Sequence, residues 1–298
     1  MMRVLFGWIL FLTAIGSIMI GGLVFPLVLG YACMLGGNEF VAMARAKGYK
    51  PSANIVRGMI IAFFILTALP NIPELDLPAD FALSHLSILF TVGICISFVR
   101  LLLRSEKPPA TIADIASTIM GFIYVGWMPC HLVLLRDLGL PGMEAITNPL
   151  QQPGLAYLWV CFFIIFGTDV FAYYAGKNFG KHLLYPEVSP KKTVEGALGG
   201  LLSSIIIATI VVYLADNYVF SCHPFQFKLI HAPLLGLVVS IAAQLGDLCE
   251  SLMKRDAGMK DSGDSIPGHG GFLDRGDSLL FAGPIAYYWI KLVVLGIL

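Results

Sequence analysis

Charged residues are scarce in this chain. Only 13% of its 298 residues are Asp, Glu, Lys or Arg, whereas 57% are hydrophobic and the mean hydropathy is +0.82. A soluble domain is about a quarter charged. The composition therefore excludes an ordinary soluble protein and predicts a polytopic membrane protein.

Several sequence patterns of soluble enzymes are also missing. The six cysteines form no CxxC pair, so the sequence predicts neither a zinc site nor a disulfide framework. It contains no Walker A loop and no GxGxxG between a strand and a helix. Nothing in the sequence favours a nucleic-acid partner. Because no linker sets off a soluble domain, we expect one integral-membrane domain over 1–298, with N-terminal helices in 1–110 and a catalytic half in 155–298.

Long apolar runs are abundant instead. A bilayer core of ~30 Å is crossed by about 20 helical residues, and nine runs approach or exceed this length. They are continuous rather than alternating, which favours an all-α protein over a barrel. The runs are 4–20, 22–43, 54–70, 82–103, 113–135, 155–176, 197–214, 229–250 and 279–297.

The basic residues are distributed unevenly between the two sides of this bundle. All but Arg136, Lys228 and Lys291 lie near the N-terminus or after the even-numbered helices. The loops of the opposite side are acidic or nearly uncharged. The positive-inside rule then places the N-terminus and the four basic loops in the cytoplasm and the C-terminus outside. We expect the inner (plasma) membrane of a cell, with an organelle membrane as the alternative, and an active site that faces the cytoplasm.

Asp169 is a carboxylate inside an apolar run. Placing an ionised carboxylate there costs at least ~2.5 kcal/mol, so it must face a polar cavity or a cation. The loop 177–196 that follows carries Ser189, Lys192 and Thr193 before a glycine-rich helix start, a combination typical of an anion site. An interhelical salt bridge for Asp169 and a topological role for the lysines are the structural alternatives.

A second polar segment covers residues 247–277. In one helix, Asp247, Glu250 and Lys254 share a face. Asp274 and Asp277, at the start of the last helix, are three residues apart, as Asp247 and Glu250 are. Mg²⁺ takes one or two carboxylates and completes its six oxygens with phosphate and water, so convergence of Asp247 and Asp274 would create a magnesium site. A surface salt-bridge network is the alternative.

The two polar segments resemble the phosphatidate cytidylyltransferase (CDP-diacylglycerol synthase) family. The resemblance lies in the C-terminal half, and the N-terminal helices match only in being apolar. Gly276 departs from the family pattern, which usually has an apolar residue there. The matching residues are Asp169, Tyr173, Gly176, Phe179–Lys181, Ser189, Pro190, Lys192, Thr193, Glu195 and Gly196, and then Ser251, Met253–Arg255, Lys260, Asp261, Gly263, Ile266, Pro267, His269–Phe272, Asp274, Arg275 and Asp277.

The resemblance implies an enzyme of phospholipid biosynthesis. It transfers CMP from CTP to phosphatidic acid and releases CDP-diacylglycerol and pyrophosphate, with Mg²⁺ as the cofactor and K⁺ as a candidate second cation. By this analogy Asp247 and Asp274 bind the metal, with Asp277 close by.

The chemistry of the reaction suggests roles for the other polar residues. Our hypothesis gives Ser189, Lys192 and Thr193 the nucleotide phosphates, and Lys254, Arg255 or Arg275 the lipid phosphate or the pyrophosphate. His269 binds phosphate or donates a proton, two roles that the sequence does not separate. The supporting residues are Lys260 and Asp261 near the phosphates and metal, and Asp169 and Glu250 within the bundle.

Two other functions stay open at this point. A CTP-dependent polyprenol or phytol kinase would release CDP rather than pyrophosphate. An ion-coupled transporter would use Asp169 and Asp247 for its ion, although such proteins often repeat their sites in two halves, and the charged sites here occur only in the second half. The sequence also leaves a homodimer open.

Overall fold

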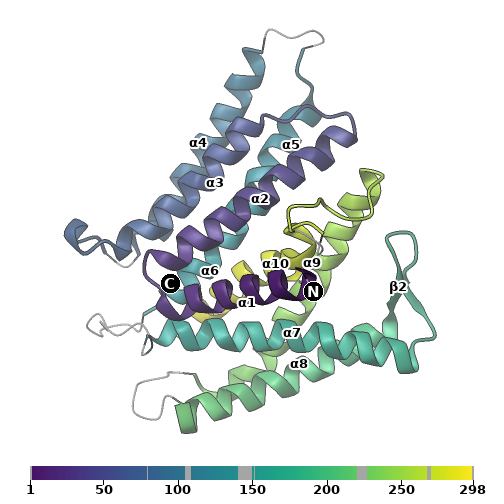
Figure 1. The fold of residues 1–298 in the computed structure, drawn as a ribbon. Coiled ribbons are helices and arrows are strands. Elements are labelled where there is room, and N and C mark those ends of the chain that lie inside the picture. The colour runs from purple at the N-terminus through teal and green to yellow at the C-terminus, as the bar shows by residue number, and fades with distance from the viewer. Residues whose placement is uncertain are drawn as a thin grey trace. The chain divides into compact units, whose positions relative to one another are not determined.

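Helices form almost all of this computed structural model, which describes residues 2–78, 80–104, 109–139, 150, 152–219, 227–266 and 270–296 (Figure 1). The chain divides into two compact units, one of residues 1–134 with 253–276 and one of residues 135–252 with 277–298. The boundaries cut helices α9 (Ala232–Asp256) and α10 (Leu273–Trp289), so each helix contributes a segment to both units. The prediction of a single membrane domain stays a prediction.

The first unit consists mainly of the N-terminal helices. Gly21 and Gly22 adopt φ values of 65° and 51°, which turn the chain between α1 and α2. Thr111 and Asp114 form a reciprocal capping box that starts α5. The helices are α1 (Met2–Ile20), α2 (Val24–Ala46), α3 (Ala53–Ala68), η1 (Leu69–Asn71), η2 (Pro73–Leu75), α4 (Phe81–Leu102), α5 (Ile112–Phe122), the π-helical turn η3 (Ile123–Trp127) and α6 (Met128–Arg136), which runs into the second unit.

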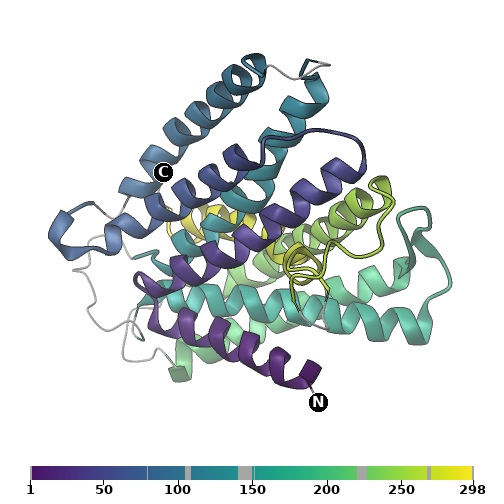
Figure 2. The ribbon, with the colours of Figure 1, turned by 45° about the horizontal axis from the view of Figure 1, so that its top comes forward.

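The second unit is built on two long helices, α7 (Pro153–Phe179) and α8 (Val194–Leu214), which lie side by side (Figures 1 and 2). Small residues allow this close packing, because a Cβ added at Gly199 would lie 2.3 Å from the Ala175 Cβ. The unit is completed by η5 (Ala215–Val219), η6 (Leu229–His231), most of α9 and α10, and η7 (Ile290–Val294).

A small hairpin connects α7 to α8. Strands β1 (Leu183–Tyr185) and β2 (Ser189–Thr193) are antiparallel, with Leu183 opposite Thr193 and Tyr185 opposite Ser189. The sequence predicted only a loop here, because Ser189–Thr193 has no alternation of apolar and polar residues. The hairpin returns β2 to the end of α7.

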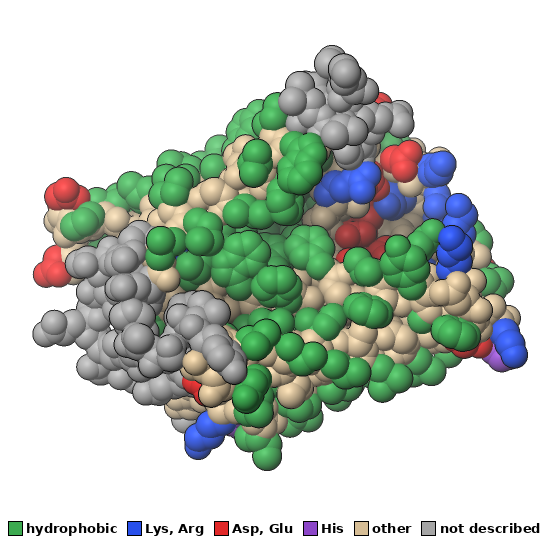
Figure 3. All heavy atoms as spheres, turned by 60° about the horizontal axis from the view of Figure 1, so that its bottom comes forward, with side chains coloured by type: hydrophobic (Ala, Val, Ile, Leu, Met, Phe, Trp, Pro, Cys, Tyr) green, Lys and Arg blue, Asp and Glu red, His purple; other side chains and the backbone are tan. Residues whose placement is uncertain are grey.

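Seven helical segments of the described chain are long and apolar enough to cross a membrane, which confirms an all-α polytopic membrane protein. Hydrophobic side chains cover much of the face drawn in Figure 3. The predicted run 4–20 is helical in α1, and the run 279–297 is helical as far as Val294 in α10 and η7, but neither is among the seven. The seven segments are Val24–Ala46, Ala53–Asn71, Phe81–Leu102, Ile112–Arg136, Pro153–Phe179, Val194–Asn217 and Leu229–Asp256.

The packing of α7 on α8 predicts the effect of enlarging Gly200. Gly200→Val should lower the free energy of unfolding by about 1–3 kcal/mol, because even a Cβ there would lie 2.8 Å from the Thr168 carbonyl oxygen. Thermal denaturation of the purified full-length protein in detergent measures the change. Gly58→Val is the matched control, since a Cβ at Gly58 meets nothing within 4 Å. Equal melting temperatures of the two variants would contradict this packing.

Candidate active site

Five residues predicted from the sequence line one cavity of about 470 Å³ in the second unit. They are Asp169 of α7, Ser189, Lys192 and Thr193 of β2, and Asp247 of α9. The structure therefore brings together Asp169, the three residues predicted to bind phosphate and one of the predicted metal ligands, Asp247. Other residues of the wall include Tyr173, Gly176, Lys177, Leu184, Lys191 and Gln244.

Local hydrogen bonds hold the hairpin at this cavity. Thr193 is the N-cap of α8, and its hydroxyl accepts a hydrogen bond of 3.1 Å from the Gly196 amide. Glu195 accepts hydrogen bonds from the amides of Lys181 and His182, at 3.0 and 3.2 Å. Gly176 is required where α7 passes the cap, because a Cβ there would lie 2.9 Å from the Thr193 hydroxyl oxygen. The sequence Thr193-Val-Glu195-Gly196 thus begins α8 and fixes the strand before it.

Lys192 and Asp247 form an ion pair in the wall of the cavity. Their side chains are only 28% and 30% exposed. A predicted phosphate ligand and a predicted metal ligand are therefore in direct contact. The pair keeps both charges satisfied at the end of an apolar bundle, and an arriving anion with its cation could exchange partners with it.

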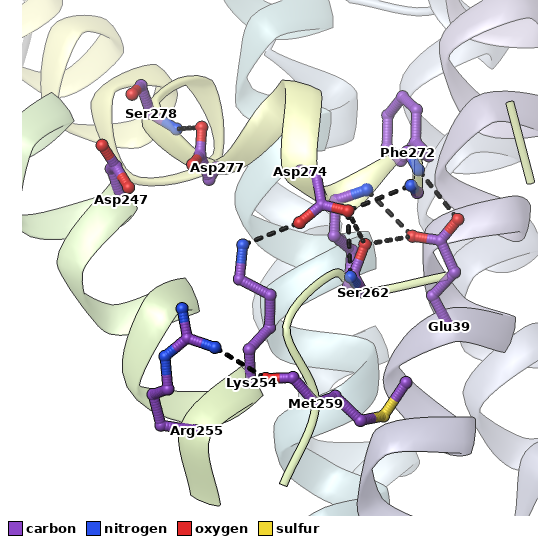
Figure 4. Close-up of polar contacts among 12 residues, drawn as sticks. Glu39, Asp247, Lys254, Arg255, Met259, Ser262, Phe272, Asp274, Asp277 and Ser278 are labelled. Carbon is purple, nitrogen blue, oxygen red and sulfur yellow. Dashed lines mark hydrogen bonds and ion pairs between the residues drawn. The ribbon is translucent and has the colours of Figure 1, made fainter. Parts of the chain in front are cut away.

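A second carboxylate lies beside Asp247 because α9 and α10 cross closely. A Cβ at Gly246 would lie 2.6 Å from the Asp277 carbonyl oxygen, so only glycine allows this approach. Figure 4 shows Asp247 and Asp277 on neighbouring turns of the two helices. Burial, and then the negative charges of Asp247 and of the fully buried Glu250, raise the pKa of Asp277. This part of the second unit therefore carries an excess of negative charge.

Gln244 is a wall residue that the sequence analysis missed. Its side-chain amide nitrogen donates hydrogen bonds to the Ala197 carbonyl oxygen (3.3 Å) and to the Ser240 hydroxyl (3.2 Å). A carbonyl oxygen only accepts, so this contact fixes which way the amide of Gln244 points. An amide side chain one turn before Asp247 in an apolar run was the available signal.

Asp274 anchors the polar loop of the first unit (Figure 4). One carboxylate oxygen accepts a hydrogen bond from Lys254 at 2.7 Å, and the other accepts from the Ser262 amide, the Ser262 hydroxyl and the Gly271 amide at 2.9 to 3.0 Å. Burial alone would raise the pKa of Asp274, but Lys254 and the two amides hold it below its ordinary value. Both oxygens of this predicted metal ligand are engaged within its own unit.

Glu39 of α2 holds the other side of the same loop. It is 4% exposed and accepts hydrogen bonds from the Phe272 amide (2.8 Å) and the Leu273 amide (3.0 Å), and it lies 3.0 Å from the Ser262 hydroxyl, whose single hydrogen it shares with Asp274. Gly271 passes close by, since a Cβ there would lie 2.6 Å from a carboxylate oxygen of Glu39. The sequence analysis placed all its candidate site residues in 155–298 and passed over Glu39, although an isolated carboxylate in an apolar helix was the same signal that singled out Asp169.

The remaining predicted residues of the first unit lie on its polar segment 253–276. Arg255 is exposed, and its guanidinium donates a hydrogen bond of 2.9 Å to the Met259 carbonyl oxygen. Lys260, Asp261 and Arg275 are exposed. His269 lies outside the described residues, so both roles predicted for it stay open.

The donor chemistry of the second unit fits magnesium bound together with phosphate. Within the described part of the chain, no group of three or more His, Cys, Asp or Glu side chains forms a ready-made metal site. Asp247 and Asp277 instead offer two carboxylates, the number with which Mg²⁺ usually binds when a substrate phosphate supplies further oxygens. Asp274 belongs to the other unit, so its convergence with Asp247 stays a prediction.

Comparison with known proteins decides the family. A model of the cytidylyltransferase family matches residues 1–293. The chain belongs to this family. The match covers the N-terminal helices as well, so restricting the resemblance to the C-terminal half was wrong. The contacts of Glu39 give a physical reason why the N-terminal helices belong to the match. This side chain of α2 accepts hydrogen bonds from the Phe272 and Leu273 amides, at the end of the polar segment 253–276.

Individual relatives support the assignment over nearly the whole chain. The phosphatidate cytidylyltransferase of Synechocystis sp. is 34% identical, with 94% of this chain and 93% of the relative aligned. That of Bacillus subtilis is 31% identical over 97% of both chains. The chloroplastic phosphatidate cytidylyltransferase 5 of Arabidopsis thaliana is 32% identical, over 97% of this chain and 71% of the relative.

The contacts of Glu39 predict the effect of removing its charge. Glu39→Gln should speed hydrogen exchange at the Phe272 and Leu273 amides by about tenfold or more, because hydrogen bonds to a buried charged acceptor stabilise by ~1.5–3 kcal/mol. Hydrogen–deuterium exchange on the full-length protein measures this rate. Glu74→Gln, at an exposed position of η2, is the control. Unchanged protection of both amides in Glu39→Gln would show that Glu39 does not hold the loop.

Proposed function

We propose that this protein transfers CMP from CTP to phosphatidic acid, giving CDP-diacylglycerol and pyrophosphate for phospholipid biosynthesis. The observation that carries the proposal is the contact between Lys192 and Asp247 in a cavity that Ser189 and Thr193 also line. A phosphate-binding lysine and a cation-binding carboxylate meet there, in a chain of the cytidylyltransferase family.

The reaction needs positioning and charge neutralisation more than it needs an activated nucleophile. An oxygen of the lipid phosphate attacks the α-phosphorus of CTP, and the bond from that phosphorus to the bridging β-oxygen breaks. The attacking phosphate monoester is largely ionised near neutral pH, since its second pKa is about 6. No general base is therefore required, and the main barrier is repulsion between two anions.

Residues of the second unit suit the nucleotide. Lys192 leaves its pair with Asp247 and contacts the triphosphate, and Ser189 donates its hydroxyl hydrogen to a phosphate oxygen. The Thr193 hydroxyl already accepts from the Gly196 amide, so its own hydrogen remains a donor for phosphate. Asp169 lines the same wall, and its negative charge balances the positive charge of Lys192.

Asp247 and Asp277 are the residues that would hold Mg²⁺. When bound, the ion neutralises phosphate charge and polarises the phosphoryl group. For this, Asp247 and Asp277 must both be ionised although Glu250 lies nearby. A bound cation would favour the ionised state, because its positive charge offsets the repulsion among the three carboxylates. K⁺ is the candidate second cation for the same excess of carboxylates. We assign Asp274 first to the loop of its own unit, and a direct metal bond there would displace a hydrogen bond.

Cationic residues of the first unit are proposed for the second anion. Lys254, Arg255 and Arg275 are assigned to the lipid phosphate or the departing pyrophosphate, with Lys260 and Asp261 in support. Lys254 is paired with Asp274, which sets its position before any ligand arrives.

The membrane arrangement belongs to the same proposal. Nine spans, including 4–20 and 279–297, place the N-terminus and the basic loops in the cytoplasm by the positive-inside rule. The reaction then takes place at the cytoplasmic face of the inner (plasma) membrane, where CTP is available. A homodimer stays a prediction from the sequence.

Replacing the two carboxylates tests the metal assignment. Asp247→Asn and Asp277→Asn should each lower the turnover of CTP and phosphatidic acid by at least ~100-fold, which corresponds to ~2.7 kcal/mol of transition-state stabilisation. The measurement is release of pyrophosphate by purified full-length protein in detergent, over a titration of Mg²⁺. Residual activity should need more Mg²⁺ than the unaltered protein does.

Two controls give this experiment its meaning. Asp216→Asn removes an exposed carboxylate of η5 in the same unit and should leave turnover unchanged. Near-normal Mg²⁺-dependent turnover in both site variants would refute the metal assignment. Release of CDP with an alcohol acceptor would instead favour the kinase, and ion uptake into liposomes without consumption of CTP would favour the transporter.

Lys192 gives a separate test of the nucleotide site. Lys192→Gln should raise the KM for CTP by about tenfold or more, because it removes a charge-assisted contact to phosphate. The KM for phosphatidic acid should change much less, and Lys228→Gln serves as the exposed control. An equal rise of both KM values would argue against a nucleotide-specific role.

A further inference from the structure

A second cavity, in the first unit, lies outside the proposed reaction site. Its volume is about 280 Å³, and it is lined by the end of α2, the connection to α3 and the end of α4. Its wall includes Arg45, Lys50, Arg100 and Arg104 and contains no acidic residue. The cavity is therefore a concentrated site of positive charge.

Three of these cations have no ion-pair partner among the residues that the structure describes: Arg45, Lys50 and Arg100. Arg104 donates a hydrogen bond of 3.2 Å to the Lys50 carbonyl oxygen and interacts with Asp114. Asp114 itself accepts hydrogen bonds from the amides of Lys50 and Thr111. Like charges that converge without a counter-charge in the wall repel one another unless an anion joins them.

The backbone adds hydrogen-bond donors to the same wall. Helix α3 begins at Ala53, and Ser52 at its N-cap makes no side-chain capping bond. Amides of a first helical turn have no acceptor within their own helix. Together with the four cations they form a pocket suited to the oxygens of a phosphate group.

The surroundings indicate where such a phosphate comes from. Leu102 and Leu103, at the end of α4 beside Arg100 and Arg104, are 81% and 71% exposed, and Ile112 at the start of α5 is 86% exposed. Large apolar side chains exposed at the end of a membrane span face acyl chains. A phosphate held by the neighbouring cations then lies at headgroup depth.

We infer that this cavity binds the phosphate of an anionic phospholipid. The inference is independent of the proposed function, because none of the four cations belongs to the proposed reaction site. A free phosphate would satisfy the same donors, but it would make no use of the exposed apolar side chains beside them. The lipid headgroup therefore fits the described residues better.

The test is a binding titration of the full-length protein in detergent with dioleoyl phosphatidylglycerol, followed by native mass spectrometry. Arg45→Gln and Arg100→Gln should each weaken binding about fivefold, and the double variant about 25-fold. The double substitution by Lys keeps both charges and should retain binding within a few-fold, which separates loss of charge from loss of folding. Lys228→Gln with Lys291→Gln removes two charges elsewhere and should have no effect.

Each other outcome counts against the inference. Equal weakening by the pocket and control variants would reduce the effect to general surface charge. Equal binding of dioleoyl phosphatidylcholine would show that anionic character is irrelevant. Inorganic phosphate that displaces the lipid at equal concentration would identify a free-phosphate site, and unchanged binding in the double Gln variant would rule out the cavity.

Discussion

The cost of placing charge in an apolar bundle governs the polar chemistry of this protein. An unpaired ion away from water costs several kcal/mol, so each charged group among the helices has to meet a partner. Lys192 pairs with Asp247 in one unit, and Lys254 pairs with Asp274 in the other. These pairs hold the proposed site residues in place, and under the proposed function an anionic substrate and its cation replace the two partners of a pair.

Close approach of backbones is the second constraint. Gly246 lets α9 cross α10 beside Asp277, and Gly176 lets α7 reach the cap of α8. Both glycines place polar groups that are far apart in the sequence next to one another. Besides their general role in helix packing, these two glycines allow the close helix contacts that place polar residues at the candidate site.

Glu39 links the two halves of the sequence within the first unit. The Glu39 carboxylate of α2 accepts hydrogen bonds from the Phe272 and Leu273 amides at the start of α10, so an N-terminal helix holds the polar segment 253–276. The family match over residues 1–293 agrees with this dependence. The sequence analysis underestimated the N-terminal helices, because the contact of α2 with the polar segment 253–276 depends on one side chain, Glu39, in an apolar run.

The sequence alone determined the membrane class, the helical fold and the residue types of the chemistry, because each follows from composition, from the length of the apolar runs or from the cost of a charge in them. It also predicted Asp169, Lys192 and Asp247 as site residues, and in the structure all three line one cavity. Only the tertiary structure decided that Lys192 meets Asp247, that Asp277 lies beside Asp247, and that Asp274 and Glu39 hold a loop. The tertiary structure also revealed the hairpin of β1 and β2, where the sequence predicted only a loop. These contacts depend on where two helices cross and on the glycines that allow their backbones to approach. The local spacing of residues in the sequence does not determine such distances between separate helices.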